Sequence, residues 1–514
     1  MPTRRLPDDP NLDHLRNQAK TLLKQVRAGD AQALALVTEF FPSERPATAP
    51  VDPEHLGSPS ADALRGLADA QLVIARSYGF PSWPQLNRHL GIVERYTRSP
   101  HRETTGNPVE TPAQRADEFL RLATLHYGQD DPQRPDAARS LLTSDPEVAQ
   151  SNFFTQVVAG DIASVRGQLA QHPHLANRQG GPFDWEPLLY LTYSRLPVAP
   201  EAPLEIARLL LEHGADPNAG FLWAGMPSPF TALTGAFGRG EGNQPPHQNR
   251  LALARLLLEA GADPNDSQTM YNCGPGCPPP HDADHLRLLL EFGLGQGDGG
   301  PWHQRLTVAH PTPRQLLEDE LVFASSEGLL DRVQLMLDAG TDPEGRGTEH
   351  PVFCGHRAFE LASVQGHAEI ATLLRAAGAP PLDDIHELFA AVLNGSTAPV
   401  DPALAARAIQ RNPYLPIRAA ELGRTEALQP LKDLGWNLNI LAMATPLHQA
   451  AWHGHLATAR KLIELGADPT LRDPNYNGTP LNWAMHSHQQ EVVDYLTGLD
   501  LRADSEEQEG AEDH

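Results

Sequence analysis

Two cysteines and two histidines lie close together in the middle of the chain, at Cys273, Cys277, His281 and His285. Thiolate sulfur and imidazole nitrogen are the ligands of structural zinc sites, so this set is compatible with a tetrahedral Zn²⁺ site. Prolines at 278–280 stiffen the link between the two pairs, and the cysteine spacing is longer than the commonest one. The alternative interpretation is a glycine- and proline-rich loop that leads into a helix beginning near His285.

Four aromatic residues in the same region could anchor a partner. They are Phe221, Trp223, Phe230 and Trp302. The first three occupy a long loop, and Trp302 follows a glycine–proline pair. Aromatic side chains often carry much of the energy of a protein interface, so we predict a partner-binding role for these four. The alternative is that they fill the core of an irregular part of the fold.

We recognise no pattern of residues in the sequence that is typical of catalysis. The glycine-rich stretch at 297–300 lacks the lysine and the preceding strand of a phosphate-binding loop. Ser77 and Ser82 have no nucleophile-elbow context. We therefore predict a protein that is not an enzyme and has no catalytic residues and no cofactor.

The elements that must position these residues are short helices in pairs. Glycines recur 12 residues apart on either side of one apolar stripe at helical spacing. These pairs are Gly328/Gly340, Gly366/Gly378, Gly423/Gly435 and Gly454/Gly466. The second glycine of a pair suits a left-handed helix cap, which glycine adopts without a steric penalty. Another apolar helix precedes each first glycine, so the unit is helix, tight turn, helix, loop.

The units are unequal in length. Further second glycines stand at 214, 261 and 293, and the intervals along the whole series range from 31 to 57 residues. The long intervals indicate insertions or a hidden helix pair, such as one expected within 385–413. The region from 219 to 310 is the most irregular part of the pattern.

The chain divides into four segments by composition. Residues 1–97 contain helical stripes of their own and are expected to form an N-terminal helical domain that caps the apolar end of the array. Residues 98–112 are polar and contain prolines, which is typical of a linker. The helix pairs occupy 113–500, and the acidic tail 501–514 is predicted to be disordered.

Charge and hydropathy restrict the partners. A formal net charge of -25 argues against nucleic acid and against anionic membranes, but it permits a basic protein partner. The sequence has neither an uninterrupted span of about 18 apolar residues nor an apolar signal segment, so we expect a soluble, cytoplasmic protein. We also expect a monomer. Lysine is rare beside arginine, which indicates the coding bias of a GC-rich, bacterial genome.

One segment carries a family resemblance. Thr445-Pro446-Leu447-His448, followed by Gly454-His455 and Gly466-Ala467-Asp468, resembles the ankyrin repeat, and Gly478-Thr479-Pro480-Leu481 starts the pattern again. Residues 113–500 resemble an ankyrin repeat array as a whole. The run Gln18-Ala19-Lys20-Thr21-Leu22-Leu23 resembles the leading segment of a group of bacterial ankyrin-repeat proteins, which has no assigned activity to carry over.

The resemblance implies a fold and a class of function. It implies an all-α solenoid of helix pairs that binds another protein through its concave surface, formed by loop tips and first-helix faces. It also implies that His448 is structural and hydrogen-bonds across the turn. The competing hypothesis is a metal- or small-ligand-dependent protein whose site lies within 219–310.

Overall fold

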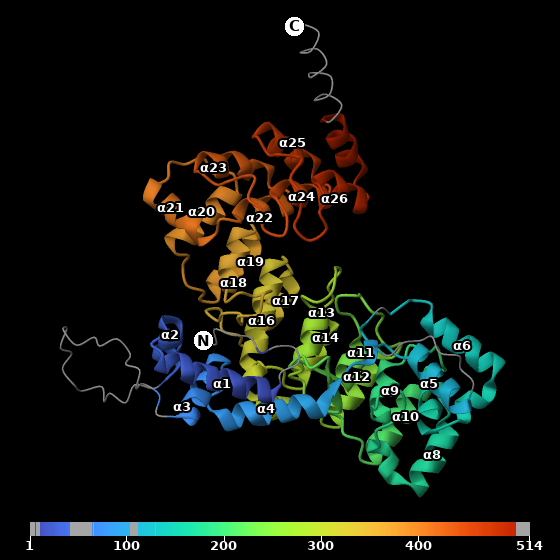
Figure 1. Cartoon of the computed structure of the whole chain (residues 1–514). Helices are drawn as coiled ribbons and strands as arrows, with labels where there is room; N and C mark the ends of the chain where they lie inside the picture. Colours follow the sequence, from blue (N-terminus) through green and yellow to red (C-terminus); the bar gives the residue numbers. More distant parts are fainter. Residues whose placement is uncertain are drawn as a thin grey trace, which may run out of the picture. The chain divides into compact units, whose positions relative to one another are not determined.

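The computed structural model describes residues 6, 11–41, 64, 66–102, 111–128 and 130–499. They form two compact units, Met1–Glu320 (unit 1) and Leu321–His514 (unit 2). Helices make up 59% of the structure and strands are few, which confirms the predicted all-α helical solenoid (Figure 1). Within the described residues, no helix is both long enough and apolar enough to cross a membrane. The predicted acidic tail lies outside the described residues.

The helices of unit 1 are short and follow one another closely. They are α1 (Leu12–Arg27), α2 (Ala31–Phe40), α3 (Leu67–Ser77), α4 (Trp83–Tyr96), α5 (Pro112–Ala123), α6 (Arg134–Ser144), α7 (Phe153–Ala159), α8 (Ile162–Gln171), α9 (Pro187–Tyr193), α10 (Glu201–Glu212), α11 (Ala232–Phe237), α12 (Arg250–Glu259), α13 (Ser267–Cys273), α14 (Asp284–Glu291) and α15 (Gly300–Leu306). Short 3-10 turns are η2 (Pro100–Arg102), η3 (Pro146–Gln150), η4 (Pro173–Asn177) and η5 (Thr307–Ala309).

The division between the units falls within α16 (Pro313–Ser326). The helices of unit 2 that follow are α17 (Leu330–Asp338), α18 (Ala358–Val364), α19 (Ala368–Ala376), α20 (Asp384–Leu393), α21 (Pro402–Arg411), α22 (Leu415–Glu421), the turn η6 (Thr425–Ala427), α23 (Leu428–Asp433), α24 (Pro446–Trp452), α25 (Leu456–Glu464) and α26 (Pro480–His486). A last helix covers residues 490–499.

The N-terminal helices of unit 1 share a core of their own. Helices α1 to α4 bury Leu15, Leu22, Val73 and Ile74, among other apolar side chains, against one another. At the C-terminal end of α4, Val93 packs in a second cluster with residues of β2 and α15. The N-terminal helices are therefore attached to the irregular middle of the unit.

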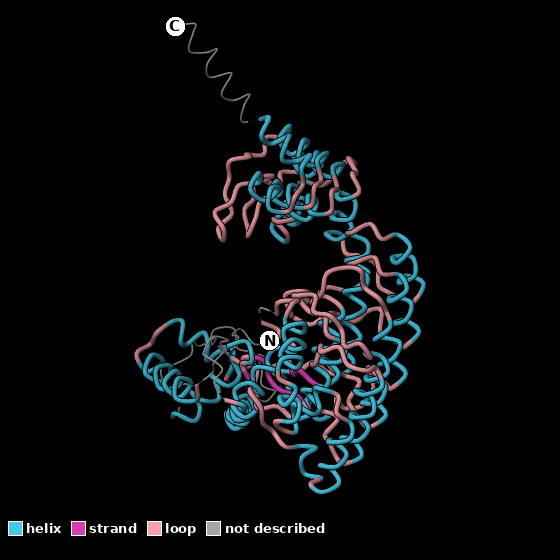
Figure 2. The backbone as a smooth tube through the Cα atoms, turned by 90° about the vertical axis from the view of Figure 1, so that its right-hand side faces the viewer, coloured by secondary structure: helices cyan, strands magenta, loops and turns pink. Residues whose placement is uncertain are grey.

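Three short strands add backbone pairing to this attachment. Strand β1 (Thr97–Arg98) pairs in parallel with β2 (Gly220–Trp223), and β2 pairs antiparallel with β3 (Pro229–Thr231). Figure 2 draws the strands in magenta. The predicted linker 98–112 thus begins in a strand and in η2 and ends at the start of α5, while residues 103–110 lie outside the described residues.

Successive helix pairs stack in register within each unit. In unit 1, α7, α9, α11 and α13 contact one another in that order, and so do α8, α10, α12 and α14. In unit 2, α18 contacts α20, and α22 contacts α24, which contacts α26. Each helix pair therefore packs on the neighbouring pairs, as the glycine spacing predicts. Gly466 ends α25 in the left-handed conformation at φ 93°, where a residue with a Cβ would be strained.

The Thr-Pro-Leu-His motif caps the start of α24 and contacts the next repeat. Thr445 caps α24 by accepting a hydrogen bond from the His448 backbone N–H, and its Oγ1 lies 2.8 Å from His448 Nδ1. The other ring nitrogen of His448 lies 3.0 Å from the carbonyl oxygen of Gly478. The predicted structural role of His448 is confirmed, and its bond links two repeats.

A second link joins the loops of adjacent repeats. The Asn439 side-chain amide donates to the carbonyl oxygen of Gly466 (3.1 Å), and its oxygen accepts from the backbone N–H of Asp468 (2.8 Å). Asn218 makes the same pair of bonds to Gly261 (2.9 Å) and Asp263 (2.8 Å). Asparagine is suited to this position because one side chain offers both a donor and an acceptor.

The asparagine link is interrupted in the first part of unit 2. Glu344 stands four residues after Gly340, the position that Asn439 occupies after Gly435, and a carboxylate has no N–H to donate. An irregular segment, 345–357, follows instead. It folds back on itself, because the Gly347 backbone N–H donates to the carbonyl oxygen of His356 at 3.0 Å.

We predict that Asn439→Ala destabilises unit 2 because the carbonyl of Gly466 and the N–H of Asp468 lose their partner. Two such bonds are worth about 1–2 kcal/mol, which lowers Tm by roughly 3–6 °C in a unit of this size. Gln429→Ala is the matched control, because Gln429 donates to Asp433 within its own helix. Equal Tm values for the two variants in a thermal melt would contradict the inter-repeat role of Asn439.

Candidate functional site

The cysteine–histidine set lies at the junction of α13 and α14. Cys273 and Cys277 are buried, and Cys277 Sγ lies 3.6 Å from His281 Nδ1. His285 is buried in the first turn of α14, with its Nδ1 3.9 Å from Asp282 Oδ1. The structure thus brings Cys277 and His281 together and gives His285 an acidic neighbour.

The four aromatic residues predicted to anchor a partner are packed within unit 1. Phe221, Phe230 and Trp302 are only 2%, 3% and 4% exposed. Phe221 stacks on Trp185 with ring centroids 4.8 Å apart. Trp302 donates from Nε1 to the carbonyl oxygen of Asn218 at 3.0 Å.

Trp223 is half-buried and also engaged with the chain itself. Its Nε1 donates to the carbonyl oxygen of His126 at 2.8 Å, and its ring stacks on His101 at 4.2 Å. The burial of Phe221, Phe230 and Trp302 between β2, β3 and α15 favours the core interpretation of these three residues. Trp223 is only half-buried, and its partner-binding role stays a prediction.

The irregular middle also contains charged groups that serve the fold. Arg195 is half-buried, and its guanidinium donates to the carbonyl oxygens of Thr192 (3.0 Å) and Gly235 (2.8 Å), while desolvation lowers its pKa to about 10. Asp266 caps α13 by accepting from the Thr269 N–H at 2.8 Å, and burial raises its pKa to about 6. Both groups satisfy backbone atoms at the ends of short helices, which have no partner within their own helix.

A buried histidine in this region gives the unit a pH dependence. Burial, with a smaller contribution from the positive charge of Arg195, lowers the pKa of His247 to about 3. Its Nδ1 accepts a hydrogen bond from the Asn249 backbone N–H at 3.0 Å, as a neutral imidazole does. In the unfolded chain His247 has its ordinary pKa of 6.5, so it binds a proton at pH values where the folded chain keeps it neutral.

We predict that His247→Gln makes unit 1 less sensitive to acid. The stability contributed by neutral His247 is complete above pH 6.5 and is lost as the pH falls toward 3, which amounts to roughly 2 kcal/mol between pH 7 and pH 5. Urea unfolding at the two pH values measures this difference. The raised pKa of Asp266 changes stability with pH in the opposite direction. Asp266 is present in both proteins, so its effect cancels when their pH dependences are compared.

His14→Gln is the matched control for that experiment, because His14 is exposed on α1. It should leave the loss of stability between pH 7 and pH 5 as large as in the unchanged chain. A loss in His247→Gln that equals the loss in His14→Gln would contradict the assignment.

Unit 2 exposes a set of large apolar side chains near its C-terminal end. Five of them lie in the last two complete helix pairs and define the apolar patch: Leu441, Met443, Trp452, Tyr476 and Met485, which are 43%, 72%, 39%, 83% and 56% exposed. Two precede α24, one ends α24, one precedes α26 and one lies in α26. The patch therefore occupies loops and first helices of adjacent repeats, and α24 and α26 contact each other (Figure 1).

The loop that presents Tyr476 is held in place by one carboxylate. Asp473 accepts hydrogen bonds from the Tyr476 N–H (2.6 Å), the Gly478 N–H (2.8 Å) and the Trp483 indole N–H (3.0 Å). Burial alone would raise the pKa of Asp473, but these bonds outweigh it and lower the pKa to about 2. Trp452 packs edge-on against Trp483 at 5.6 Å. The loop that carries Tyr476 is thus held by an ionised aspartate.

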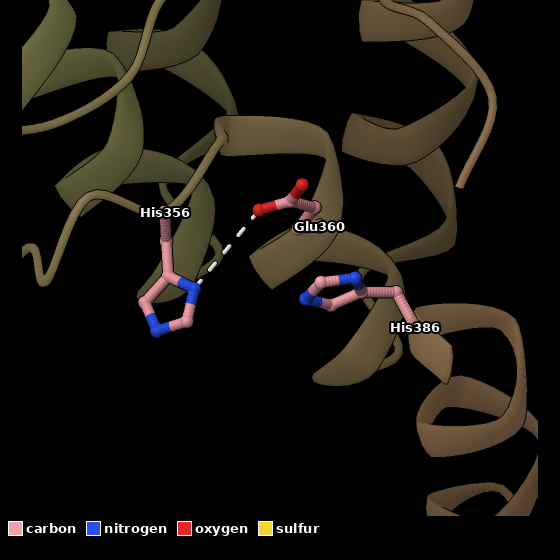
Figure 3. Close-up of side chains that lie close together, drawn as sticks. All are labelled: His356, Glu360 and His386. Atoms are coloured by element: carbon pink, nitrogen blue, oxygen red, sulfur yellow. Dashed lines mark ion pairs between the residues drawn. The ribbon is translucent and has the colours of Figure 1, made fainter. Parts of the chain in front are cut away.

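A pocket of about 360 Å³ opens in unit 2 between the irregular segment 345–357 and the start of α20. Among its lining residues are Arg346, His356, Glu360, His386 and Arg411. Figure 3 shows the His356, Glu360 and His386 side chains turned toward one another. Glu360 and His386 are buried, whereas His356 is partly exposed.

Local structure fixes two of these three side chains, Glu360 and His386. Glu360 in the first turn of α18 accepts a hydrogen bond from the Arg357 N–H at 2.9 Å and so caps the helix. Asp383 caps α20 and its Oδ1 lies 2.8 Å from His386 Nδ1. Burial lowers the pKa of His356, although Glu360 opposes this effect.

Sequence reasoning did not find this cluster or the apolar patch. The available signal for the cluster was His356 and Glu360 at a spacing of four residues across a helix start, with His386 one repeat length further on. For the patch, the signal was large apolar residues in positions that precede or end the first helices.

Stacked helix pairs, joined by asparagine and histidine bonds between successive loops, define a helical repeat protein. Residues 416–507 match the family described as ankyrin repeats, in three copies. This part of the chain is therefore similar to ankyrin repeats, and the matched residues include α22, α24, α26 and the whole apolar patch. A search of curated proteins finds no match to this chain.

Proposed function

We propose that this protein binds another protein through the apolar patch and the neighbouring loop tips of its last repeats. Ankyrin repeats generally mediate protein–protein interactions. The observation that carries the proposal is the apolar patch, because large apolar side chains with this exposure lie on loops and first helices of adjacent repeats. The proposed role is binding, and it includes no catalytic step.

The chemistry of the patch indicates what it binds. Tryptophan, tyrosine and methionine are side chains that protein interfaces favour, and buried aromatic anchors dominate binding energies. The chain carries 65 acidic residues against 40 basic ones. We therefore propose a partner that offers apolar side chains within a basic rim, since opposite charges raise the rate of association and exclude acidic competitors.

We predict that Tyr476→Ser weakens binding of the partner by at least about 10-fold, which corresponds to about 1.4 kcal/mol. The full chain is used to capture the partner, and the affinity of the purified pair is then measured by calorimetry. Tyr414→Ser is the matched control, because Tyr414 is 47% exposed and lies outside the patch. A partner that binds both variants equally well uses another surface and would contradict the proposal.

A metal site in the irregular middle is the second candidate function. The observation that favours it is the distance of 3.6 Å between Cys277 Sγ and His281 Nδ1, with Cys273 and His285 nearby in sequence and also buried. Imidazole and thiolate together prefer Zn²⁺. In this alternative, the helix pairs serve as a scaffold for the site.

We predict for this alternative that the purified chain binds Zn²⁺ and that Cys273→Ser and His285→Ala each reduce the zinc bound at this set. Substitution with Co²⁺ would give a thiolate-to-metal charge-transfer absorption that disappears in Cys273→Ser. Elemental analysis that finds the same metal content in the variants and in the unchanged chain would eliminate this second candidate.

A further inference from the structure

We propose that His356, Glu360 and His386 hold a divalent metal ion of the zinc type at the pocket of unit 2. This site is separate from the apolar patch and from the cysteine–histidine set. One ligand atom of each residue lies within 4.8 Å of a ligand atom of the other two (Figure 3). Two imidazoles and one carboxylate are a donor set that Zn²⁺ binds while one position remains open.

The distances require only a small adjustment on binding. Metal–ligand bonds of about 2.0–2.2 Å place tetrahedral ligands roughly 3.3–3.6 Å apart, so the three donor atoms must approach by about 1 Å. His356 Nδ1 already lies 4.0 Å from Glu360 Oε2. Rotation about side-chain bonds can supply this movement, because His356 precedes α18 and is partly exposed.

The environment of His386 prepares it as a ligand. Asp383 Oδ1 lies 2.8 Å from Nδ1 of His386, which places the ring proton on that nitrogen and leaves the lone pair on Nε2. Figure 3 shows Nε2 directed toward His356 and Glu360. A carboxylate that orients the far nitrogen of a histidine is a common support of metal ligands and increases their basicity. Asp383 is therefore assigned as a positioning residue.

Glu360 can serve the helix and a metal at the same time. Its Oε2 accepts the Arg357 backbone N–H, and Arg357 Nη1 lies 3.8 Å from Oε1. An ionised carboxylate has about four lone-pair directions, so these contacts leave positions for a cation. The side chain is 9% exposed, and burial of a carboxylate favours a counter-charge close by.

The arginines of the pocket indicate what would occupy the open position. Arg346 and Arg411 line the same pocket, and Arg346 is fixed by a bond from Nη1 to the carbonyl oxygen of Gly355 at 2.9 Å. Guanidinium groups prefer carboxylate and phosphate oxygens. An anionic group bound to the metal would therefore be stabilised from both sides.

The test is titration of the metal-free full chain with Zn²⁺ by calorimetry and with Co²⁺ by visible absorption. We expect one ion bound per site, with a cobalt spectrum that lacks thiolate charge transfer. His386→Ala should abolish this binding. Glu360→Gln should weaken it while the amide oxygen preserves the helix cap, and circular dichroism checks that both variants fold. Asp383→Asn should weaken it by about 10-fold.

His453→Ala is the matched control, because His453 is an exposed histidine of unit 2 outside the cluster, and it should bind the metal as the unchanged chain does. Failure of the folded chain to bind Zn²⁺ or Co²⁺ would overturn the proposal. So would binding that survives in His386→Ala, or binding that disappears only in Cys273→Ser. Phosphate binding by the metal-free chain that Arg411→Ala removes, without any metal binding, would show an anion site instead.

Discussion

The bonds between adjacent repeats are the constraint on which the rest of the structure depends. A single helix pair of this length cannot bury its apolar face alone, so each pair requires a neighbour at a fixed distance and register. Asn439 supplies this register in the loops with one donor and one acceptor, and His448 supplies it at the helix starts with a bond to the Gly478 carbonyl. Where both are present, adjacent loops are held in a fixed register.

The apolar patch and the pocket of unit 2 differ because the bonds between repeats are complete beside the patch and interrupted beside the pocket. In the last repeats the bonds are complete, and the apolar patch rests on a regular framework that includes Asp473. Earlier, Glu344 replaces the asparagine and segment 345–357 takes the place of a short loop. That departure opens the pocket beside His356 and Glu360. A regular repeat thus presents a surface, whereas an interrupted one creates a concave site.

Much of the fold was predictable from residue types, and the sites were not. Gly466 and Gly435 mark helix ends because the left-handed conformation is a local property of the backbone. The burial of Phe221 and Trp302 was not predictable in this way, since it depends on the pairing of β1 with β2. These two strands lie more than a hundred residues apart in the sequence. Their aromatic character alone fits a core and an interface equally well.

By itself, the sequence determined the repeating unit, the all-α class and the ankyrin family of the last repeats, because helix periodicity, caps and turn residues act over a few neighbouring positions. Only the tertiary structure decided which side chains meet or remain exposed. His386 joins His356 and Glu360 because α18 and α20 stack, and Tyr476 stays exposed because Asp473 holds its loop outward. Such contacts depend on how whole helices pack, which local spacing does not specify.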